Sequence, residues 1–404
     1  MKIGTTTMLA KSSLCCLLTL IMGLTAHAQA LNIGRMAHAQ EKLPPGTSVV
    51  RIEAQPANIT LKTPYAYSQL LITAHLNTGD RVDVTRVVQI EAPANLVKVS
   101  PTGQVRPQAD GTGPMKINLA GKTASIPITV SGQKAAYEPS FVKDIMPVMA
   151  KVGCNAGTCH GAQSGKNGFK LSLRGYDPLF DHRALTDDIA GRRFNRAAPE
   201  QSLMLLKPAG GVPHVGGVLF QPGEPYYELI NNWIATGVKL DLSSPRVTGI
   251  DIQPKNPIMP LIGMKQQMAV VATYSDGSVR DVTSEAIIEP SSIEMASVDK
   301  QGLATGIRRG ETAIMARFEG AYTATTLIIM GDRSGFTWND LPTNNYIDAL
   351  VYEKLRQVKI QPSELCTDPE FIRRVYLDLT GLPPQPDEVR AFLTDPRHSE
   401  VKRN

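Results

Sequence analysis

The sequence predicts a multidomain fold in which two all-β sandwiches flank an all-α module, and a further, incomplete all-α module follows them. Three observations predict this fold class. At 404 residues the chain is too long for one ordinary core. The alternation typical of half-buried strands occurs in two similar segments, residues 70–86 and 268–284. Between and after these segments, apolar residues recur at helical spacing.

The first residues have the composition of an export signal. Lys2 and Lys11 supply positive charge, residues 14–24 are apolar, and the tripeptide AHA at 26–28 is a small-residue cleavage site. We therefore predict a signal peptide over 1–28 and a periplasmic or cell-envelope location. The apolar run is shorter than the roughly 20 residues of a spanning helix, so no transmembrane helix is expected. A net charge of +5 is mild and scattered, which argues against nucleic-acid binding.

The two similar segments predict two small β-sandwiches, over 46–132 and 246–331. In each segment a glycine, Gly79 or Gly277, lies where a tight turn between strands needs positive φ. Each copy spans about 85 residues of short strands with regular turn signals, which is typical of a sandwich.

These copies carry a recognisable hairpin pattern. The second copy has DGS at 276–278 and DVT at 281–283, and the first has DVT at 83–85. This pattern resembles the bacterial Ig-like domains of group 2. The resemblance implies spacer or adhesive modules.

Residues 137–240 predict the all-α module. Ser140 is placed to cap a helix through Val142 and Ile145, and Pro147 should kink or shorten that helix. The run EPYYELINNWIATG predicts a second helix that stops near Gly237. Two short helices would then bracket a loop-rich middle, which suits a cofactor pocket.

The motif GCNAGTCHG at 153–161 lies in that middle and permits three interpretations. A disulfide between Cys154 and Cys159 leaves His160 unexplained. A zinc site needs four ligands, and only Cys366 could readily join these three residues. In a covalent haem site, both thiols would attach to the ring and His160 would bind the iron.

We favour haem, although four residues separate the cysteines where the usual pattern has two. The Cys159-His160 adjacency is kept, and Gly157 would let the additional residues bulge outward. A covalent haem site needs surrounding helices, aromatic side chains and export of the protein. The sequence predicts all three, with the aromatic residues on the second helix.

A resemblance supports this interpretation. Residues 141–178, FVKDIMPVMAKVGCNAGTCHGAQSGKNGFKLSLRGYDP, are followed by PHVGG at 213–217 and PGEPYYELINNWIATG at 222–237. Together they are similar to the planctomycete-type cytochrome c module. The resemblance implies one haem c on Cys154 and Cys159, with His160 as an iron ligand.

A haem iron that only passes electrons usually takes a second side-chain ligand. We favour His214 over Met204, because His214 lies on a loop before the second helix, beside a Gly-Gly pair at 216–217. An open sixth position would instead permit ligand binding. Arg174 could pair with a haem propionate or be solvated. Other candidates for the second ligand are Met146, Met149 and His182.

The last segment, 342–404, predicts three amphipathic helices that begin near residues 344, 369 and 387. The run FIRRVYLDLTGLPP at 371–384 is similar to a domain of unknown function, DUF1549, that accompanies such cytochromes in exported planctomycete proteins. In that family the domain continues further, so we expect a fragment of a larger protein. We assign no role to Cys366.

The favoured function is an exported c-type cytochrome that passes electrons to a redox partner protein or to further domains of the full-length chain. An electron carrier is favoured over an enzyme, because the sequence has no Ser-His-Asp order, phosphate loop or His-Glu-x-x-His pattern. The alternative is a cell-envelope structural or adhesive protein with a Cys154–Cys159 disulfide and no haem. A third interpretation is an enzyme whose active site lies in a part of the full-length protein outside this fragment.

Overall fold

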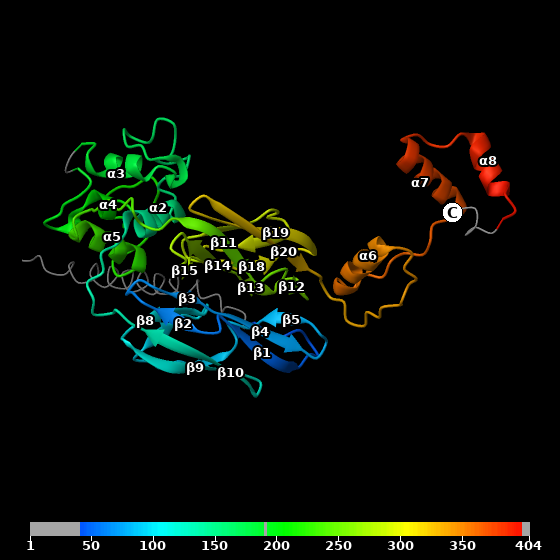
Figure 1. The fold of residues 1–404 in the computed structure, drawn as a ribbon, viewed down its shortest axis with the longest axis horizontal. Helices are drawn as coiled ribbons and strands as arrows, with labels where there is room; N and C mark the ends of the chain where they lie inside the picture. Colours follow the sequence, from blue (N-terminus) through cyan, green and yellow to red (C-terminus); the bar gives the residue numbers. More distant parts are fainter. Residues whose placement is uncertain (1–40, 190–191, 398–404) are drawn as a thin grey trace, which may run out of the picture.

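The computed structural model describes residues 41–189 and 192–397, which contain six small β-sheets. Three sheets come from each sequence copy, and the two copies lie against each other with a group of short helices beside the second (Figure 1). The predicted signal peptide, 1–28, lies outside the described residues. Within the described residues, no helix is long and apolar enough to cross a bilayer.

The first copy forms a three-stranded sheet β1-β4-β5, a four-stranded sheet β2-β10-β9-β6 and a small sheet β3-β8-β7. Neighbouring strands are antiparallel, except that β2 and β10 are parallel. Its strands are β1 (Val49–Gln55), β2 (Ile59–Leu61), β3 (Ser68–Gln69), β4 (Leu71–Leu76), β5 (Arg81–Asp83), β6 (Gln89–Glu91), β7 (Val97–Val99), β8 (Gln104–Pro107), β9 (Gly111–Leu119) and β10 (Lys122–Val130).

The second copy repeats this topology as β11-β14-β15, β12-β20-β19-β16 and β13-β18-β17. The register is repeated too: Gln55 lies opposite Leu71, and Gln253 lies opposite Ala269. Its strands are β11 (Val247–Gln253), β12 (Ile258–Met259), β13 (Lys265–Gln267), β14 (Ala269–Tyr274), β15 (Val279–Asp281), β16 (Ile287–Pro290), β17 (Ala296–Val298), β18 (Leu303–Gly306), β19 (Gly310–Phe318) and β20 (Ala321–Ile329).

Each copy has its own apolar core, which the strand alternation explains. In β4, Ile72, Ala74 and Leu76 are buried, whereas the intervening Thr73 and His75 are partly exposed. Burying one face of a strand while the other stays wet is the normal arrangement of an antiparallel sheet. The two cores approach each other at Met264, which packs against both.

The copies are joined by a reciprocal contact of their DVT motifs. Asp83 Oδ2 accepts a hydrogen bond from the backbone N of Gln267 at 2.6 Å, and Asp281 Oδ2 accepts one from the backbone N of Gln69 at 2.6 Å. Each aspartate also accepts from the backbone N of the threonine two residues later in its own copy. Each carboxylate therefore fixes its own turn and holds the other copy. We call this pair of contacts the reciprocal clamp.

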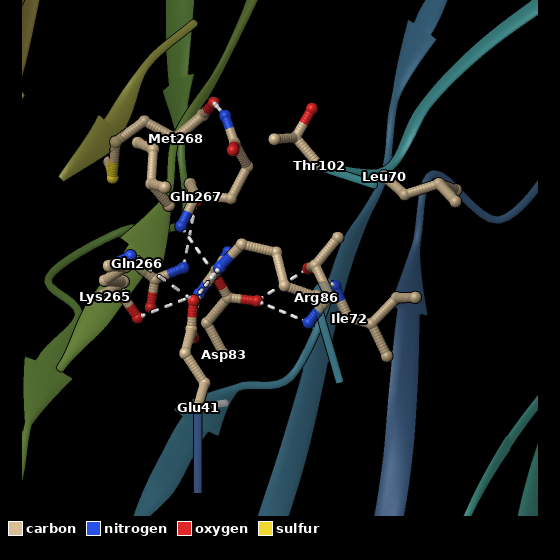
Figure 2. A network of polar contacts seen from close by, with 12 residues as sticks. Glu41, Leu70, Ile72, Asp83, Arg86, Thr102, Lys265, Gln266, Gln267 and Met268 are labelled. Atoms are coloured by element: carbon tan, nitrogen blue, oxygen red, sulfur yellow. Dashed lines mark hydrogen bonds and ion pairs between the residues drawn. The ribbon is translucent and has the colours of Figure 1, made fainter. Parts of the chain in front are cut away.

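An arginine strengthens the first half of the reciprocal clamp (Figure 2). Arg86 donates to Asp83 Oδ2 at 2.8 Å and to Glu41 Oε1 at 2.7 Å. Its guanidinium also reaches the carbonyl of Lys265 at 3.5 Å. The corresponding residue of the second copy is Ser284, whose hydroxyl accepts from Gln104 Nε2 at 2.8 Å. The two halves of the interface are thus similar in plan and different in detail.

Residues 137–240 show that the predicted fold class is wrong, because they do not form an all-α haem module. Among the described residues of this segment, only two helices exceed six residues, and turns and loops make up most of the remainder. Glycine and proline recur between the helices and interrupt them. The helices are η1 (Phe141–Ile145), α2 (Met146–Lys151), η2 (Leu173–Gly175), α3 (Pro178–Thr186), η3 (Pro199–Gln201), α4 (Leu203–Leu206) and α5 (Pro225–Ala235).

The helix predicted after Ser140 is broken in two. Ser140 Oγ caps η1 by accepting from the backbone N of Lys143 at 2.9 Å. Pro147 lies in the first turn of α2, where a missing N–H costs least. The predicted second helix is α5. Its Trp233 is fully buried and stacks on Phe141 at 5.2 Å between ring centroids, so these two rings form the centre of this segment's core.

The last segment forms α6 (Tyr346–Gln357), α7 (Asp368–Thr380) and α8 (Pro386–Thr394). α7 ends at a glycine, since its C-cap residue Gly381 has φ 72°. Lys359, just after α6, pairs with Asp80 of the first copy at 3.0 Å. In Figure 1, α7 and α8 lie away from the β-sheets, and the rings of Phe371 and Phe392 stack between them at 6.0 Å.

Candidate functional site

The motif at 153–161 borders a cavity of about 440 Å³, within the size range of small-molecule sites. We call it the motif cavity. Cys154, Cys159 and His160 line it, and so do Met204 and His214. The structure therefore brings both cysteines together with the motif histidine and the two favoured candidates for a second ligand. Met149 also lines the motif cavity, whereas Met146, His182 and Arg174 are not among its lining residues.

The two histidines are held in the same way. Nδ1 of His160 lies 3.0 Å from the carbonyl oxygen of Phe169, and Nδ1 of His214 lies 2.8 Å from that of Gly217. A carbonyl oxygen only accepts, so each ring carries a proton on Nδ1, and in the neutral form of such a ring Nε2 is an acceptor. Burial lowers the pKa of His160, and nearby His214 lowers it further. His160 therefore favours the neutral form, in which Nε2 can serve as a ligand.

The two thiols are free in the structure, so the disulfide of the alternative interpretation is not formed there. Burial and, to a smaller extent, the neighbouring Cys159 raise the pKa of Cys154 to about 12. Cys154 is consequently a protonated, weakly nucleophilic thiol at neutral pH. Cys366 lies in the segment before α7 and does not line the motif cavity, so the four-ligand zinc site is not assembled. Across the described residues, no three His, Cys, Asp or Glu side chains are grouped to hold a metal ion.

Backbone hydrogen bonds fold the motif into a tight loop. The N of His160 donates to the carbonyl of Cys154 at 3.0 Å, and the N of Gly161 donates to that of Ala156 at 3.0 Å. Gly157 does not have the positive φ that would let it take an unusual conformation; that conformation occurs at Gly153, with φ 86°. The loop therefore turns at its first glycine and closes at its last.

Gly161→Ala is expected to disrupt this loop. A Cβ there would lie 2.1 Å from the carbonyl oxygen of Asn155, which is a backbone atom that cannot simply rotate away. We expect a loss of about 1–3 kcal/mol in the free energy of unfolding, as for other overpacked sites, and faster reaction of Cys154 with a thiol reagent. Gly157→Ala is the matched control, because its Cβ would meet only Leu173 at 3.6 Å. Equal thiol reactivity in the two variants would contradict this account.

Arg174 lies in a different place from the one the sequence suggested. Its backbone has φ 59° and ψ 19°, and its N donates to the carbonyl of Asn155 at 3.0 Å. It lines a second cavity, of about 810 Å³, between residues 142–176 and the second β copy. We call this space the interdomain cavity. The lining of the motif cavity does not include Arg174, so the structure does not bring it together with the cysteines and histidines.

The interdomain cavity contains residues that sequence reasoning missed. Arg246, Arg317, Glu319 and Tyr322 line it from the second copy. Arg317, Glu319 and Tyr322 lie on the hairpin formed by β19 and β20, and Arg246 lies just before β11, about 70 positions earlier in the chain. The sandwich fold alone would allow both copies the same residues at these positions. The difference between the two copies is therefore the signal by which sequence reasoning could have found these residues.

Glu319→Gln is expected to stabilise the protein at pH 8 but not at pH 4.5. Burial raises the pKa of Glu319 to about 7, above its usual 4.5. The folded state therefore binds this proton more tightly, and stability falls as the pH rises from about 4.5 to about 7. Removing the carboxylate should therefore raise the free energy of unfolding by about 1–3 kcal/mol above pH 7. Melting temperatures at the two pH values test this, with exposed Glu294→Gln as the control. A shift of equal size at both pH values would contradict it.

Comparison with known proteins identifies the last segment. Residues 346–404 match the family described as "Protein of unknown function (DUF1549)", which confirms the resemblance proposed for this segment. Over 90 residues the chain is 36% identical to "Ice-binding protein 1" of Shewanella frigidimarina. That match covers 21% of this chain and 10% of the relative, so the chain spans about a tenth of the relative's length.

Among solved structures, the chain is similar to parts of the surface-layer protein SbsC. Domains 5–6 of SbsC match with a TM-score of 0.29 and 10% identity, over 71% of this chain and 100% of that one. Domains 1–6 match with a TM-score of 0.20 and 11% identity, over 74% of this chain and 29% of that one.

The predicted main function, a c-type cytochrome that transfers electrons, is therefore wrong. The curated match is to an ice-binding protein, residues 137–240 do not form an all-α haem module, and the described residues hold no ready metal-binding group. The findings also give no support to the cytochrome c and Ig-like group 2 resemblances. They favour the alternative, a structural or adhesive protein of the cell envelope. The attachment of haem c to Cys154 and Cys159 stays a prediction.

Proposed function

We propose that this chain is part of an exported cell-envelope protein with a structural or adhesive role, in which the paired β copies form one rigid unit. The observation that carries this proposal is the reciprocal clamp. Asp83 and Asp281 each hold the backbone of the other copy at 2.6 Å. Two domains joined only by a flexible linker would lack such buried, directional contacts.

Residues 137–240 add further contacts to the second copy. Arg280 donates to Asp144 Oδ1 at 2.9 Å, and Lys151 Nζ donates to the carbonyl of Ala286 at 2.6 Å. Tyr226 Oη donates to the carbonyl of Ser284 at 2.8 Å. The charged pair is mostly buried on the aspartate side, where an ion pair is least screened by solvent. These contacts support a rigid three-part body rather than separate modules.

The first copy contacts the same region. Tyr67 Oη donates to Glu285 Oε2 at 2.5 Å and accepts from the backbone N of Ser284 at 2.8 Å. One tyrosine of the first copy thus meets the loop of the second copy that Lys151 and Tyr226 also contact. The similarity to a protein named for binding ice supports an adhesive role for the matched 90 residues.

Two measurements test the proposal on the full chain with its leader. Fractionation of producing cells should recover the mature protein with the envelope. Small-angle X-ray scattering of the purified protein should give the compact paired arrangement, and the Asp83→Ala, Asp281→Ala double variant should give a larger radius of gyration. A cytoplasmic location, or wild-type scattering of independently moving domains, would overturn the proposal. So would a covalently bound porphyrin that is reversibly oxidised and reduced.

A further inference from the structure

We infer that the interdomain cavity binds an acidic sugar, with the carboxylate held by arginines and the hydroxyl groups by two polar side-chain atoms that have no hydrogen-bond partner within residues 41–189 and 192–397. The cavity has a volume of about 810 Å³ and opens between residues 142–176 and the second β copy. This site goes beyond the structural role proposed above and does not depend on it.

Three guanidinium groups supply the anion-binding character. Arg174, Arg246 and Arg317 all line the interdomain cavity. None of them forms an ion pair with a carboxylate among the residues that the structure describes. A guanidinium presents parallel N–H donors that match the two oxygens of a carboxylate. Three such groups around one cavity therefore favour a carboxylate-bearing ligand.

Two residues that line the same cavity each have a polar atom without a partner in the described part of the chain. Asn155 is 1% exposed, and its Nδ2 has no hydrogen-bond acceptor there; Glu319 Oε1 is buried and has no donor there. Leaving a buried donor or acceptor unsatisfied costs free energy, which a bound group can return. A sugar hydroxyl both donates and accepts, so hydroxyl groups would satisfy both atoms. An anion without a hydroxyl group, such as chloride, could not donate to Glu319 while it binds the arginines.

Two tyrosine rings complete the lining. Tyr176 is 78% exposed and Tyr322 is 67% exposed, and both line the interdomain cavity. Large aromatic rings are normally covered, and an exposed ring offers a flat apolar surface with a polar tip. The C–H face of a pyranose can pack on such a surface while its hydroxyls face polar groups.

The first copy provides an internal comparison. The strand register places Ile287 opposite Arg317 in the second copy and Gln89 opposite Asn118 in the first. The sandwich fold therefore does not require a charge at this position. The same holds for the other lining residues of the second copy: the counterparts of Arg246, Glu319 and Tyr322 are Ser48, Ala120 and Thr123.

Saturation-transfer NMR on the full chain tests this inference, with D-glucuronate as the probe, D-glucose as the neutral analogue and inorganic phosphate as a competitor. We expect saturable transfer to glucuronate and about tenfold weaker binding in Arg246→Gln and Arg317→Gln, the change that follows the loss of one charge-assisted contact. Arg174→Gly should weaken binding too, and its φ of 59° suits glycine, so the fold is kept. Exposed Arg308→Gln is the control and should bind as wild type does.

Four results would overturn the inference. The first is no saturable transfer from wild-type protein to glucuronate, and the second is equal binding of glucose and glucuronate. The third is displacement of glucuronate by phosphate with equal affinity, which would indicate a general anion site. The fourth is binding by all three arginine variants equal to that of the Arg308→Gln control, at the wild-type melting temperature.

Discussion

Asp83→Ala is expected to lower the free energy of unfolding by about 3–5 kcal/mol, the usual cost of removing one partner from a buried charged pair. The Asp83 side chain is 1% exposed. It accepts from the backbone N of Thr85 at 2.8 Å, from Arg86 at 2.8 Å and from the backbone N of Gln267 at 2.6 Å. Alanine would leave these donors without their acceptor in a buried place, so both the turn and the pairing of the copies should weaken.

Urea unfolding followed by circular dichroism measures this loss. Asp276→Ala is the matched control, because Asp276 lies in the exposed turn of the second copy and, within the described ranges, its side chain accepts hydrogen bonds only from Ser278 of that turn. We expect the control to lose less than about 1 kcal/mol, as is usual for surface positions. If Asp83→Ala loses no more free energy of unfolding than this control does, the reciprocal clamp contributes little to stability.

Trp233→Ala is expected to cost about 3–5 kcal/mol and to unfold residues 137–240 before the β copies, since truncating a fully buried aromatic leaves a large cavity. Trp233 is 0% exposed and stacks on Phe141. The ring of Phe194 contacts the Trp233 ring edge to face, with 5.6 Å between the ring centroids. Nε1 of Trp233 donates to the carbonyl of Lys239 at 3.1 Å. One ring thus holds η1, the loop before η3 and the end of α5.

Hydrogen exchange with mass spectrometry distinguishes local from global loss. In Trp233→Ala, amides of α2 and α5 should exchange faster, while those of β4 and β14 keep wild-type protection. Trp338→Ala is the control, since Trp338 packs near Tyr352 of α6 and should leave residues 137–240 unchanged. Uniformly faster exchange across the β copies would show that the three parts unfold together.

Local patterns predicted local structure well. The alternation in the two copies predicts half-buried strands, and β4 shows the expected burial. The predicted stop near Gly237 and the cap at Ser140 are found as well, because a cap or stop depends on neighbouring residues. The motif residues Cys154, Cys159 and His160 share one cavity because they are adjacent in sequence, and His214 joins them through the fold.

Contacts between distant segments could not be predicted in this way. The clamp residues Asp83 and Gln267 are 184 positions apart, and their contact uses a backbone N–H that every residue except proline has. Arg174 lines the interdomain cavity and not the motif cavity, and the sequence alone does not distinguish these two spaces. The all-α prediction failed for a related reason: two helical patterns were visible, and the loops between them, which form most of the segment, carry no periodic signal.

The reciprocal clamp has a consequence for the origin of the chain. Two identical contacts exchanged between two similar domains are what a symmetric homodimer has at its interface. Joining both subunits by gene duplication makes their association unimolecular, so it no longer weakens on dilution. It also allows the sequences of the two halves to differ, because neither half has to pair with an identical copy of itself. Position 82 of one half can stay valine while its equivalent, Arg280, acquires a new neighbour in Asp144.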